Sequence, residues 1–372
     1  MEQFYQDKPI KIAIVGAGPA GIYCALQILF GFKEINFSNF EISIFDKNQA
    51  LRTLLPTGGG RCNITNTISD IKEFASNYPR GEKFLYSLFS RHFNSDSVEF
   101  FNKIGIKTYH QEDGRIFPVS NSAKEVKDKM LSALKKFKNA RLINKEIITK
   151  DDLKDFDKII ISAGSKNTTQ LIKNFNQPMI EFKRALCALK VKNFKYPKGV
   201  SIKSLDGDFI FTSDGISGPL AFKISSININ TSFPYEIEIK LFNFEELENL
   251  IKNNTKKSIG TIISQLIPKS LAHAIVENFD KKASEIAKET LKSYTTLKLT
   301  ILNNSSFGEI VHAGGVKLDS IDKNCKSKLI PNLWFCGEIL DIDGFCGGFN
   351  LQNCWSSAYV VAKDVIYSII NK

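Results

Sequence analysis

The chain has 372 residues, which is too long for one compact core and predicts two or three domains. Its 43% hydrophobic and 24% charged residues are typical of a globular protein, so the composition excludes a collagen-like, mucin-like or disordered chain. The formal net charge of +11 suits an anionic partner such as nucleic acid, but an ordinary solvated lysine surface explains it equally well.

Cysteine and histidine spacing limits the possible chemistry. Seven cysteines without CxxC spacing argue against a disulfide framework, a thioredoxin-like pair and a tetrahedral zinc site. No two of the four histidines have the spacing that would hold a metal from one helix face, so we expect no metal. The N-terminus lacks a basic segment leading into an apolar run, so we expect no secretory signal and a cytoplasmic protein with reduced thiols.

The first predicted elements are a buried strand at 11–15, a glycine turn and a buried helix from residue 22. The uncharged run 12–32 is long enough to span a bilayer, but its strand, turn and helix pattern argues against a membrane segment. In the GxGxxG turn the first glycine permits the turn, the second lets the backbone approach a pyrophosphate, and the third lets helix and strand pack. We therefore predict dinucleotide contacts at Gly16, Ala17, Gly18, Pro19, Ala20 and Gly21.

A second buried strand follows and ends at Asp46, which is placed to accept hydrogen bonds from a ribose. Lys47 comes directly after it and is included among the predicted cofactor contacts. The helices further along are predicted as scaffold. Asp96 and Glu99 have capping-box spacing, and 123–137 has the apolar periodicity of an amphipathic helix.

The middle of the chain has two compositions. Residues 186–240 predict a small antiparallel barrel or sandwich, whereas residues 241–304 predict short helices. The stretch 181–203 carries seven basic residues and one acidic residue. Such a stretch is typical of an RNA surface, and also of a lysine-rich edge strand, which we favour. The aromatic residues interleaved with these charges are Phe182, Phe194 and Tyr196.

The C-terminal region predicts a second junction between a strand and a helix. The strand ends at Cys336, a glycine-rich loop follows, and a helix begins at about residue 350. An extended FAD needs a second helix N-terminus of this kind, and Gly337, Glu338 or Asp341 are placed to hold its ribityl-phosphate region. The fold class is therefore α/β. A Rossmann-like FAD-binding domain, a β-barrel-like insertion and a helical subdomain are predicted at 1–185 with 305–372, at 186–240 and at 241–304.

Six motifs make the sequence similar to the HI0933-like flavoproteins, whose members are described as NAD(P)/FAD-dependent or aminoacetone-oxidase-family oxidoreductases. The resemblance covers most of the chain, and its GGGRCN and GE.LD..G..GG.NLQ motifs are together far more specific than the glycine turn. The motifs are GAGPAG at 16–21, GGGRCNITN at 58–66, DGRIFPVS at 113–120, FTSDGISGP at 211–219, HAGGV at 312–316 and GEILDIDGFCGGFNLQ at 337–352.

The resemblance implies that the GGGRCN loop lies against the flavin, where glycine backbone and Arg61 can stabilise negative charge as the ring is reduced. Cys62 becomes a candidate general acid, although a packed cysteine is the commoner case. Arg115 becomes a substrate-side candidate. Ser217 is expected to shape a loop, because its surroundings fail the G-x-S-x-G pattern of an esterase. The further cofactor contacts implied are Gly59, Gly60, Arg61, Cys62, Asn63, Ala163, Gly164, Gly314, Gly315, Gly337, Glu338, Asp341, Gly347, Gly348, Phe349, Asn350 and Leu351.

These features predict an FAD-dependent oxidoreductase, with NAD(P)H as the transient donor. The resemblance extends to relatives connected with the reduction of a uridine in ribosomal RNA, in which case the basic stretch would hold RNA and the base would have to be unstacked. The alternative is a flavin oxidase or reductase that acts on a small molecule. A non-catalytic flavin-binding module is the third hypothesis, and none of the three requires a membrane partner.

Overall fold

The computed structural model describes residues 8–165, 168–305 and 311–371. Residues 1–7, which carry most of the N-terminal segment examined for a secretory signal, lie outside this described part. The chain packs into two compact units, Met1–Lys183 with His312–Lys372, and Arg184–Val311. The second unit is inserted between two segments of the first, and the finer domain boundaries given above remain predictions.

The first unit is built on a parallel sheet whose five strands follow the order β16 (Leu333–Phe335), β7 (Lys158–Ile161), β1 (Ile10–Val15), β2 (Phe40–Asp46) and β6 (Ala140–Asn144). Apolar, mostly β-branched residues form these strands because both faces of such a sheet are covered, and Ile12, Ile14 and Ile42 are fully buried. The chain order reverses between β1 and β7. The crevice at the carboxyl ends of two such strands is where open α/β sheets bind their ligands.

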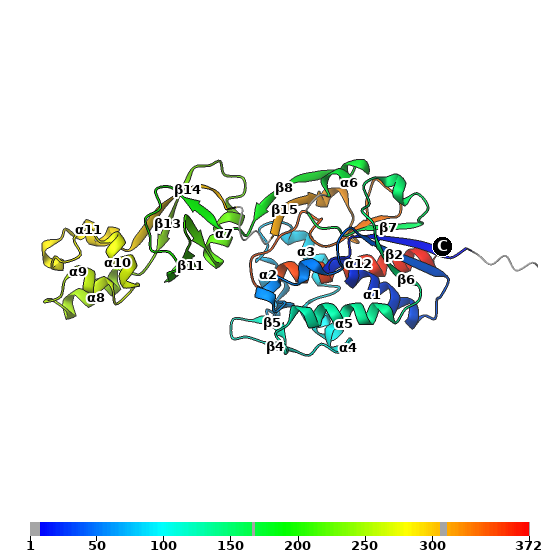
Figure 1. The fold of residues 1–372 in the computed structure, drawn as a ribbon, viewed down its shortest axis with the longest axis horizontal. Coiled ribbons are helices and arrows are strands. Elements are labelled where there is room, and N and C mark those ends of the chain that lie inside the picture. The colour runs from blue at the N-terminus through cyan, green and yellow to red at the C-terminus, as the bar shows by residue number, and fades with distance from the viewer. Residues whose placement is uncertain (1–7, 166–167, 306–310, 372) are drawn as a thin grey trace, which may run out of the picture. The chain divides into compact units, whose positions relative to one another are not determined.

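Two buried helices follow the glycine-rich junctions and lie side by side (Figure 1). Helix α1 (Pro19–Glu34) begins with a proline, whose missing N–H costs nothing at the first helical position. Helix α12 (Phe349–Ile370) begins after Gly348, which has a left-handed φ of +92°. The strand, turn and helix predicted within 12–32 are confirmed. Within the described part of the chain, no helix combines the length and the apolar character that crossing a membrane requires.

Helix α4 (Asn94–Lys103) differs from the sequence prediction. It begins two residues before Asp96, so that this carboxylate lies in the first turn and accepts the Phe93 N–H at 2.6 Å. The capping box predicted between Asp96 and Glu99 is therefore wrong. The amphipathic helix predicted nearby is confirmed as α5 (Ala123–Lys135), which Ser122 caps by accepting a backbone N–H.

The remaining elements of the first unit lie around this sheet. A small antiparallel sheet has the strand order β3-β5-β4, and β5 follows a turn at Asp113 and Gly114. Two further strands, β8 and β15, pair with each other. The bounds are β3 Thr65–Asn66, β4 Thr108–His110, β5 Arg115–Pro118, β8 Met179–Ala185, β15 Val311–Val316, α2 Ile71–Ala75, α3 Glu82–Phe89 and α6 Thr169–Asn174.

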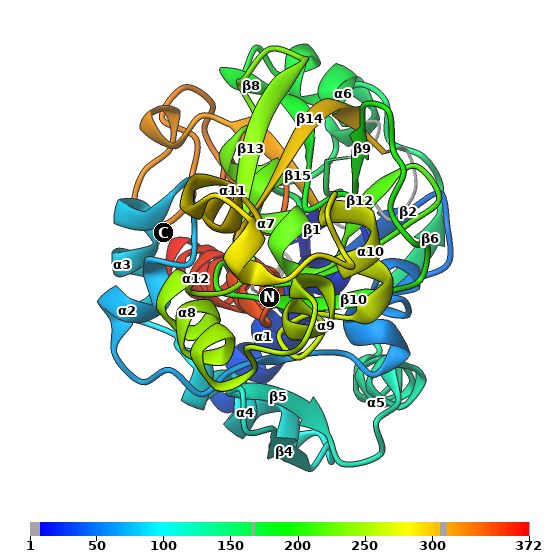
Figure 2. The ribbon, with the colours of Figure 1, turned by 90° about the vertical axis from the view of Figure 1, so that its left-hand side faces the viewer.

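The inserted unit combines an antiparallel sheet with short helices. One cluster of buried side chains contains residues from both, such as Ile216, Leu247 and Ile301. The Leu205 N–H donates to the Lys240 carbonyl at 2.9 Å, which links the chain after β10 to the end of β13, the two outer strands of this sheet. Closure of the sheet into the predicted barrel remains a prediction. Strands β13 and β14 lie side by side (Figure 2). The sheet order is β10 Ser201–Ser204, β11 Gly207–Phe211, β12 Gly215–Ser217, β9 Leu189–Val191, β14 Thr296–Asn304 and β13 Tyr235–Lys240; the helices are α7 Pro219–Ile227, α8 Phe244–Asn253, α9 Ile259–Ile263, α10 Lys269–Ile275 and α11 Lys288–Ser293.

Candidate cofactor and active site

In the glycine turn between β1 and α1, two glycines are enclosed by other parts of the protein and one faces open space. A Cβ on Gly16, where φ is +105°, would lie 2.5 Å from the Cα of Ala163, and a Cβ on Gly21 would lie 1.9 Å from the carbonyl oxygen of Gly16. A Cβ on Gly18 would meet only the Thr53 hydroxyl, at 3.7 Å. The first and third glycines are therefore required by the protein's own packing. The second leaves bare backbone facing space that the chain does not fill, which fits the approach of a pyrophosphate.

Asp46 lies at this turn, as a ribose-binding carboxylate must. Its Oδ2 accepts the Ala17 N–H at 2.8 Å, and its Oδ1 accepts the Asn48 N–H at 2.8 Å. Each carboxylate oxygen has two lone pairs, so both can still accept a ribose hydroxyl. The side chain of Lys47 instead makes an ion pair with Glu146 at 2.5 Å on the surface. The Asp46 carboxylate thus lies at the turn, whereas the Lys47 ammonium is engaged on the surface, and both cofactor contacts remain predictions.

The GGGRCN loop exposes glycine backbone in the same manner. Gly59 and Gly60 have φ values of +68° and +84°, and a Cβ on Gly59 would meet nothing within 4 Å. The Arg61 guanidinium donates to the Gly58 carbonyl at 3.2 Å and lies 4.3 Å from the centre of the Phe117 ring. The loop thus presents unobstructed main chain beside a positioned positive charge, an arrangement that suits a flavin edge on which negative charge develops.

Cys62 is placed differently from the residues around it. It is fully buried, and its φ of +63° is uncommon for a residue with a side chain. Burial raises the pKa of the thiol to about 12, while a hydrogen bond with Thr57 acts in the opposite direction. The thiol is therefore enclosed by the protein, which favours the packed cysteine over a general acid that must reach a substrate.

Hydrogen bonds join the GGGRCNITN loop to the distant loop that precedes α12. With the amide of Asn63 oriented to satisfy its neighbours, its oxygen accepts the Gly348 N–H at 2.9 Å. The Asn66 amide donates to the Gly347 carbonyl at 3.2 Å. A Cβ on Gly348 would lie 2.5 Å from the backbone of Thr65, so only glycine permits this approach. The two most specific motifs of the resemblance therefore form one structure at the N-terminus of α12.

The side chains at the start of α12 serve the loop and the core. The Asn350 amide donates to the Gly344 carbonyl at 2.6 Å and accepts the Gly344 N–H at 2.9 Å, which closes the loop on itself. Phe349 and Leu351 are buried. Their contribution to a cofactor site is therefore their backbone N–H groups, which the first turn of a helix leaves without an intrahelical partner.

Glu338 and Asp341 lie between β16 and α12. The Glu338 carboxylate accepts the His312 N–H at 3.0 Å and lies 3.7 Å from the Cβ position of Gly164. The Asp341 Oδ1 is buried without a hydrogen-bond partner in the described part of the chain, and burial raises the pKa of this carboxyl. A buried acceptor without a donor is costly. A ribityl hydroxyl would satisfy it, so the residues present fit FAD.

Three of the other predicted glycine positions are explained by packing. A Cβ on Gly314 would lie 2.4 Å from the Glu181 carbonyl oxygen, and a Cβ on Gly315 would lie 2.3 Å from the Ile339 carbonyl oxygen. A Cβ on Gly337 would lie 2.6 Å from the Cβ of Ala20. Nothing in this geometry adds support for Gly314 and Gly315 as cofactor contacts.

The remaining predicted residues lie in two places. Arg115 makes an ion pair with Asp113 at 2.6 Å. Its charge also acts on Cys346 of the loop before α12, where burial raises the thiol pKa to about 11 and Arg115 opposes that shift. Arg115 is thus near the two joined loops, as a substrate-side residue should be. Ser217 ends β12 in the inserted unit, and its role remains a prediction.

The sequence did not predict an ion pair that holds the loop before α12, the second of the two joined loops. The Nε and Nη2 atoms of Arg80 both donate to the carboxylate of Asp343, which is completely buried. The Tyr78 hydroxyl donates to the Phe349 carbonyl at 2.5 Å. No spacing signal connects residues so far apart in the chain. Within the described residues, no group of three or more His, Cys, Asp or Glu side chains is placed to hold a metal ion.

Comparison with known proteins finds relatives along nearly the whole chain. The family model described as the HI0933-like protein Rossmann domain matches residues 10–364. A ribosomal RNA dihydrouridine synthase of Haemophilus influenzae is 26% identical, covering 95% of this chain and 97% of its own. A 3-dehydro-bile acid delta(4,6)-reductase of Clostridium scindens is 24% identical, covering 95% of this chain and 98% of its own. A solved 3-ketosteroid delta1-dehydrogenase of Sterolibacterium denitrificans shares the fold with a TM-score of 0.52 and 9% identity, covering 97% and 100% of the two chains.

Proposed function

Because the chain belongs to the HI0933-like family of FAD-dependent oxidoreductases, we propose that it uses NAD(P)H to reduce a carbon–carbon double bond conjugated to a carbonyl group. The observation that carries this proposal is the match, over the full length, to two relatives whose names both describe the saturation of such a bond. We further propose that the substrate is a uridine of ribosomal RNA, whose C5–C6 bond would become a single bond.

The protein's own residues supply binding and electrostatics. Bound FAD provides the hydride transfer. Gly18 and Asp46 would hold its pyrophosphate and ribose, and Asp341 a hydroxyl of the ribityl chain. The N–H groups at the start of α12 and the Gly59–Gly60 backbone would favour negative charge on the ring. Overall, NAD(P)H gives a hydride and solvent gives a proton, so the double bond gains two hydrogens and NAD(P)⁺ is released.

RNA would meet the inserted unit through charge and not through base stacking. Lys192, Lys195 and Lys198 of the basic stretch are exposed and can contact phosphates. Tyr196 instead stacks on Phe211 inside the inserted unit, with ring centres 5.0 Å apart. We place the reaction in the cytoplasm, where the seven cysteines, none of which forms a disulfide in the described structure, stay reduced.

A small-molecule reductase is the second candidate, and the likeness to the bile acid reductase favours it. A flavin-binding module without catalysis is the third. The two enzyme hypotheses share a cofactor site and differ in what must reach the flavin. An RNA substrate requires a salt-dependent contact with phosphates, whereas a small enone requires only an apolar pocket.

Anaerobic turnover with purified holoprotein separates these hypotheses. NADH or NADPH is added first, and bleaching of the visible flavin absorbance shows whether the donor reduces the enzyme. Ribosomal RNA from cells that lack the gene, or a steroid enone, is then added as the acceptor. Reoxidation with new dihydrouridine in the RNA supports the proposal, and reoxidation by the enone alone supports the second candidate. A flavin that neither donor bleaches contradicts both and leaves the binding module.

A further inference from the structure

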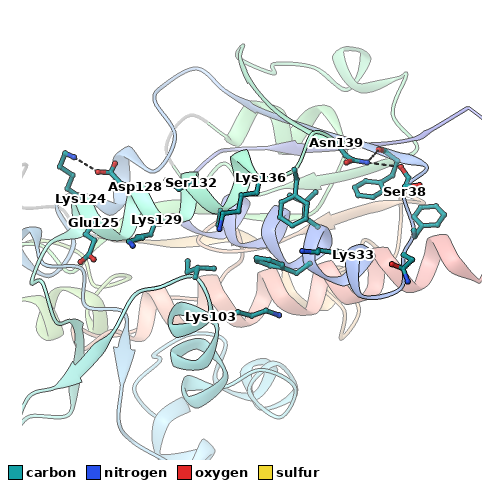
Figure 3. Close-up of a pocket in the computed structure, with 18 of the residues that line it drawn as sticks. Lys33, Ser38, Lys103, Lys124, Glu125, Asp128, Lys129, Ser132, Lys136 and Asn139 are labelled. Atoms are coloured by element: carbon teal, nitrogen blue, oxygen red, sulfur yellow. Dashed lines mark hydrogen bonds and ion pairs between the residues drawn. The ribbon is translucent and has the colours of Figure 1, made fainter.

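A groove of about 1090 Å³ lies in the first unit between α1, the end of α4 and α5 (Figure 3). None of the predicted cofactor residues lines it. Its floor is apolar and partly aromatic. The Phe30 and Phe137 rings meet edge to face with centres 5.5 Å apart, and Phe37 also lines the groove. All three rings are only partly buried, so aromatic surface stays open to a ligand.

The rim of the groove carries an excess of positive charge. Two of its lysines are neutralised, because Lys124 makes an ion pair with Asp128 at 2.6 Å and Lys103 makes one with Glu34 at 3.5 Å. Lysine outnumbers acidic residues five to two along the lining. The charged side chains that line the groove are Lys33, Lys103, Lys124, Lys129, Lys136, Glu125 and Asp128.

Three of these lysines remain available for a ligand. Lys33, Lys129 and Lys136 are exposed, and none makes a side-chain hydrogen bond or ion pair with the described residues. Lys129 of α5 and Lys136, the residue after this helix, extend toward the groove, whereas Lys124 turns away to Asp128 (Figure 3). Three unpaired ammonium groups around one hollow favour an occupant with several negative charges.

We propose that this groove binds a single-stranded segment of RNA, an inference that rests on the proposed function. Proteins that bind single strands combine a basic groove for the phosphates with aromatic surface for the bases. Duplex RNA would use the lysines alone, because its bases are already stacked. Helix α5, which forms one wall, also contacts the Thr57–Gly60 turn of the predicted flavin loop. RNA that flanks an unstacked uridine at the flavin would therefore continue along α5.

The test compares two triple variants of the full-length holoprotein. Lys33→Gln, Lys129→Gln and Lys136→Gln together remove the free charge from the groove. Lys256→Gln, Lys257→Gln and Lys281→Gln form the matched control, because these exposed lysines of the inserted unit lower the net charge equally and none lines the groove. Both variants should melt as the wild type does, and NAD(P)H should bleach their flavin at the wild-type rate.

The readout is the fluorescence anisotropy of a labelled oligouridine at several salt concentrations. Each phosphate contact contributes roughly 0.7 to the slope of log affinity against log salt, so the groove variant should lower the slope by about 2. Its affinity at physiological salt should fall about tenfold, and the control should stay within about twofold of the wild type. A duplex of the same sequence should bind the wild type more weakly than the single strand.

The outcomes keep this inference separate from the proposed function. If the groove variant binds RNA as tightly as the wild type does, while the wild type still forms dihydrouridine, RNA binding in the groove is contradicted and the proposed reaction is not. Equal binding of duplex and single strand overturns the role of the apolar floor. A wild-type enzyme that neither binds RNA nor forms dihydrouridine removes the proposed substrate, and the groove inference falls with it.

Discussion

Replacing Gly18 with alanine tests whether the backbone at this position approaches the pyrophosphate of the cofactor. Gly18 has φ −76° and ψ −171°, which alanine adopts without strain, and its new Cβ would meet only the Thr53 hydroxyl at 3.7 Å. The apoprotein should therefore stay within about 1 kcal/mol of the wild-type stability, because the entropy that alanine removes from the unfolded chain opposes its poorer propensity for the N-cap of α1.

The same methyl group lies where the main chain must approach the pyrophosphate. Loss of one charge-assisted hydrogen bond costs about 2 kcal/mol, which is roughly thirtyfold in the dissociation constant of FAD. Titration of apoprotein with FAD, followed by quenching of flavin fluorescence, measures this affinity. Thermal denaturation of the apoprotein measures stability in parallel.

Gly21→Ala is the matched comparison within the same turn. Its Cβ would lie 1.9 Å from the Gly16 carbonyl oxygen, so this variant should lose several kcal/mol of stability before any cofactor is added. The two alanines should thus separate binding from folding. Wild-type FAD affinity in Gly18→Ala, or an unfolded Gly18→Ala apoprotein, would refute the assignment of this position to the pyrophosphate.

Three further predictions follow from buried groups. Arg80→Ala should lower the free energy of unfolding by about 3–5 kcal/mol in urea titrations, because it removes the ion-pair partner of the completely buried Asp343 carboxylate, and Asp343→Ala added to it should recover part of that loss; equal stability of Arg80→Ala and the wild type contradicts this. Burial lowers the pKa of His92 to about 4, so the folded protein keeps this imidazole neutral at pH values where the unfolded chain protonates it. The free energy of unfolding is therefore highest above about pH 6.5 and falls by about 3 kcal/mol as the pH drops to 4. His92→Gln should flatten that slope in urea titrations across this range, and an unchanged slope refutes the cause. Cys62→Ala should form dihydrouridine at a rate within about twofold of the wild type, since the thiol is enclosed. A hundredfold lower rate would instead support Cys62 as the general acid.

Local features of the sequence were sufficient to predict the cofactor turn. The strand, the glycines and α1 are adjacent in the chain, and each glycine's role depends on contacts made within that unit or with the neighbouring strand. Gly16 and Gly21 pack as the pattern requires, and Gly18 stays open. The Asp46 carboxylate, predicted to bind a ribose, lies at the turn for the same reason, because parallel pairing of β2 with β1 brings their carboxyl ends together.

The start of α4 shows where a local pattern fails. The spacing of Asp96 and Glu99 fits a capping box, yet the helix begins earlier and Asp96 serves its first turn. Tertiary contacts hold the earlier start, since the buried Asn94 amide at the first helical position donates to the carbonyls of Asn66 and Ile68 at 2.7 Å each. A sequence pattern of four residues cannot reveal contacts with such distant segments.

Contacts between distant segments could not be predicted. Asn63 and Gly348 meet because the two loops share one end of the sheet, and nothing in their spacing reveals it. The ion pair between Arg80 and Asp343 is equally invisible, although it places the second loop. The sequence therefore indicated which loops matter, whereas the tertiary structure shows what joins them and why Cys62 is enclosed.

We propose that this protein saturates a uridine in ribosomal RNA. A dihydrouridine map of ribosomal RNA from cells with the gene, cells without it, and deleted cells that carry it on a plasmid tests this substrate. We expect one dihydrouridine to disappear on deletion and to return with the wild-type gene. An unchanged map in cells shown to make the protein would contradict the RNA substrate and direct the search to small conjugated carbonyl compounds.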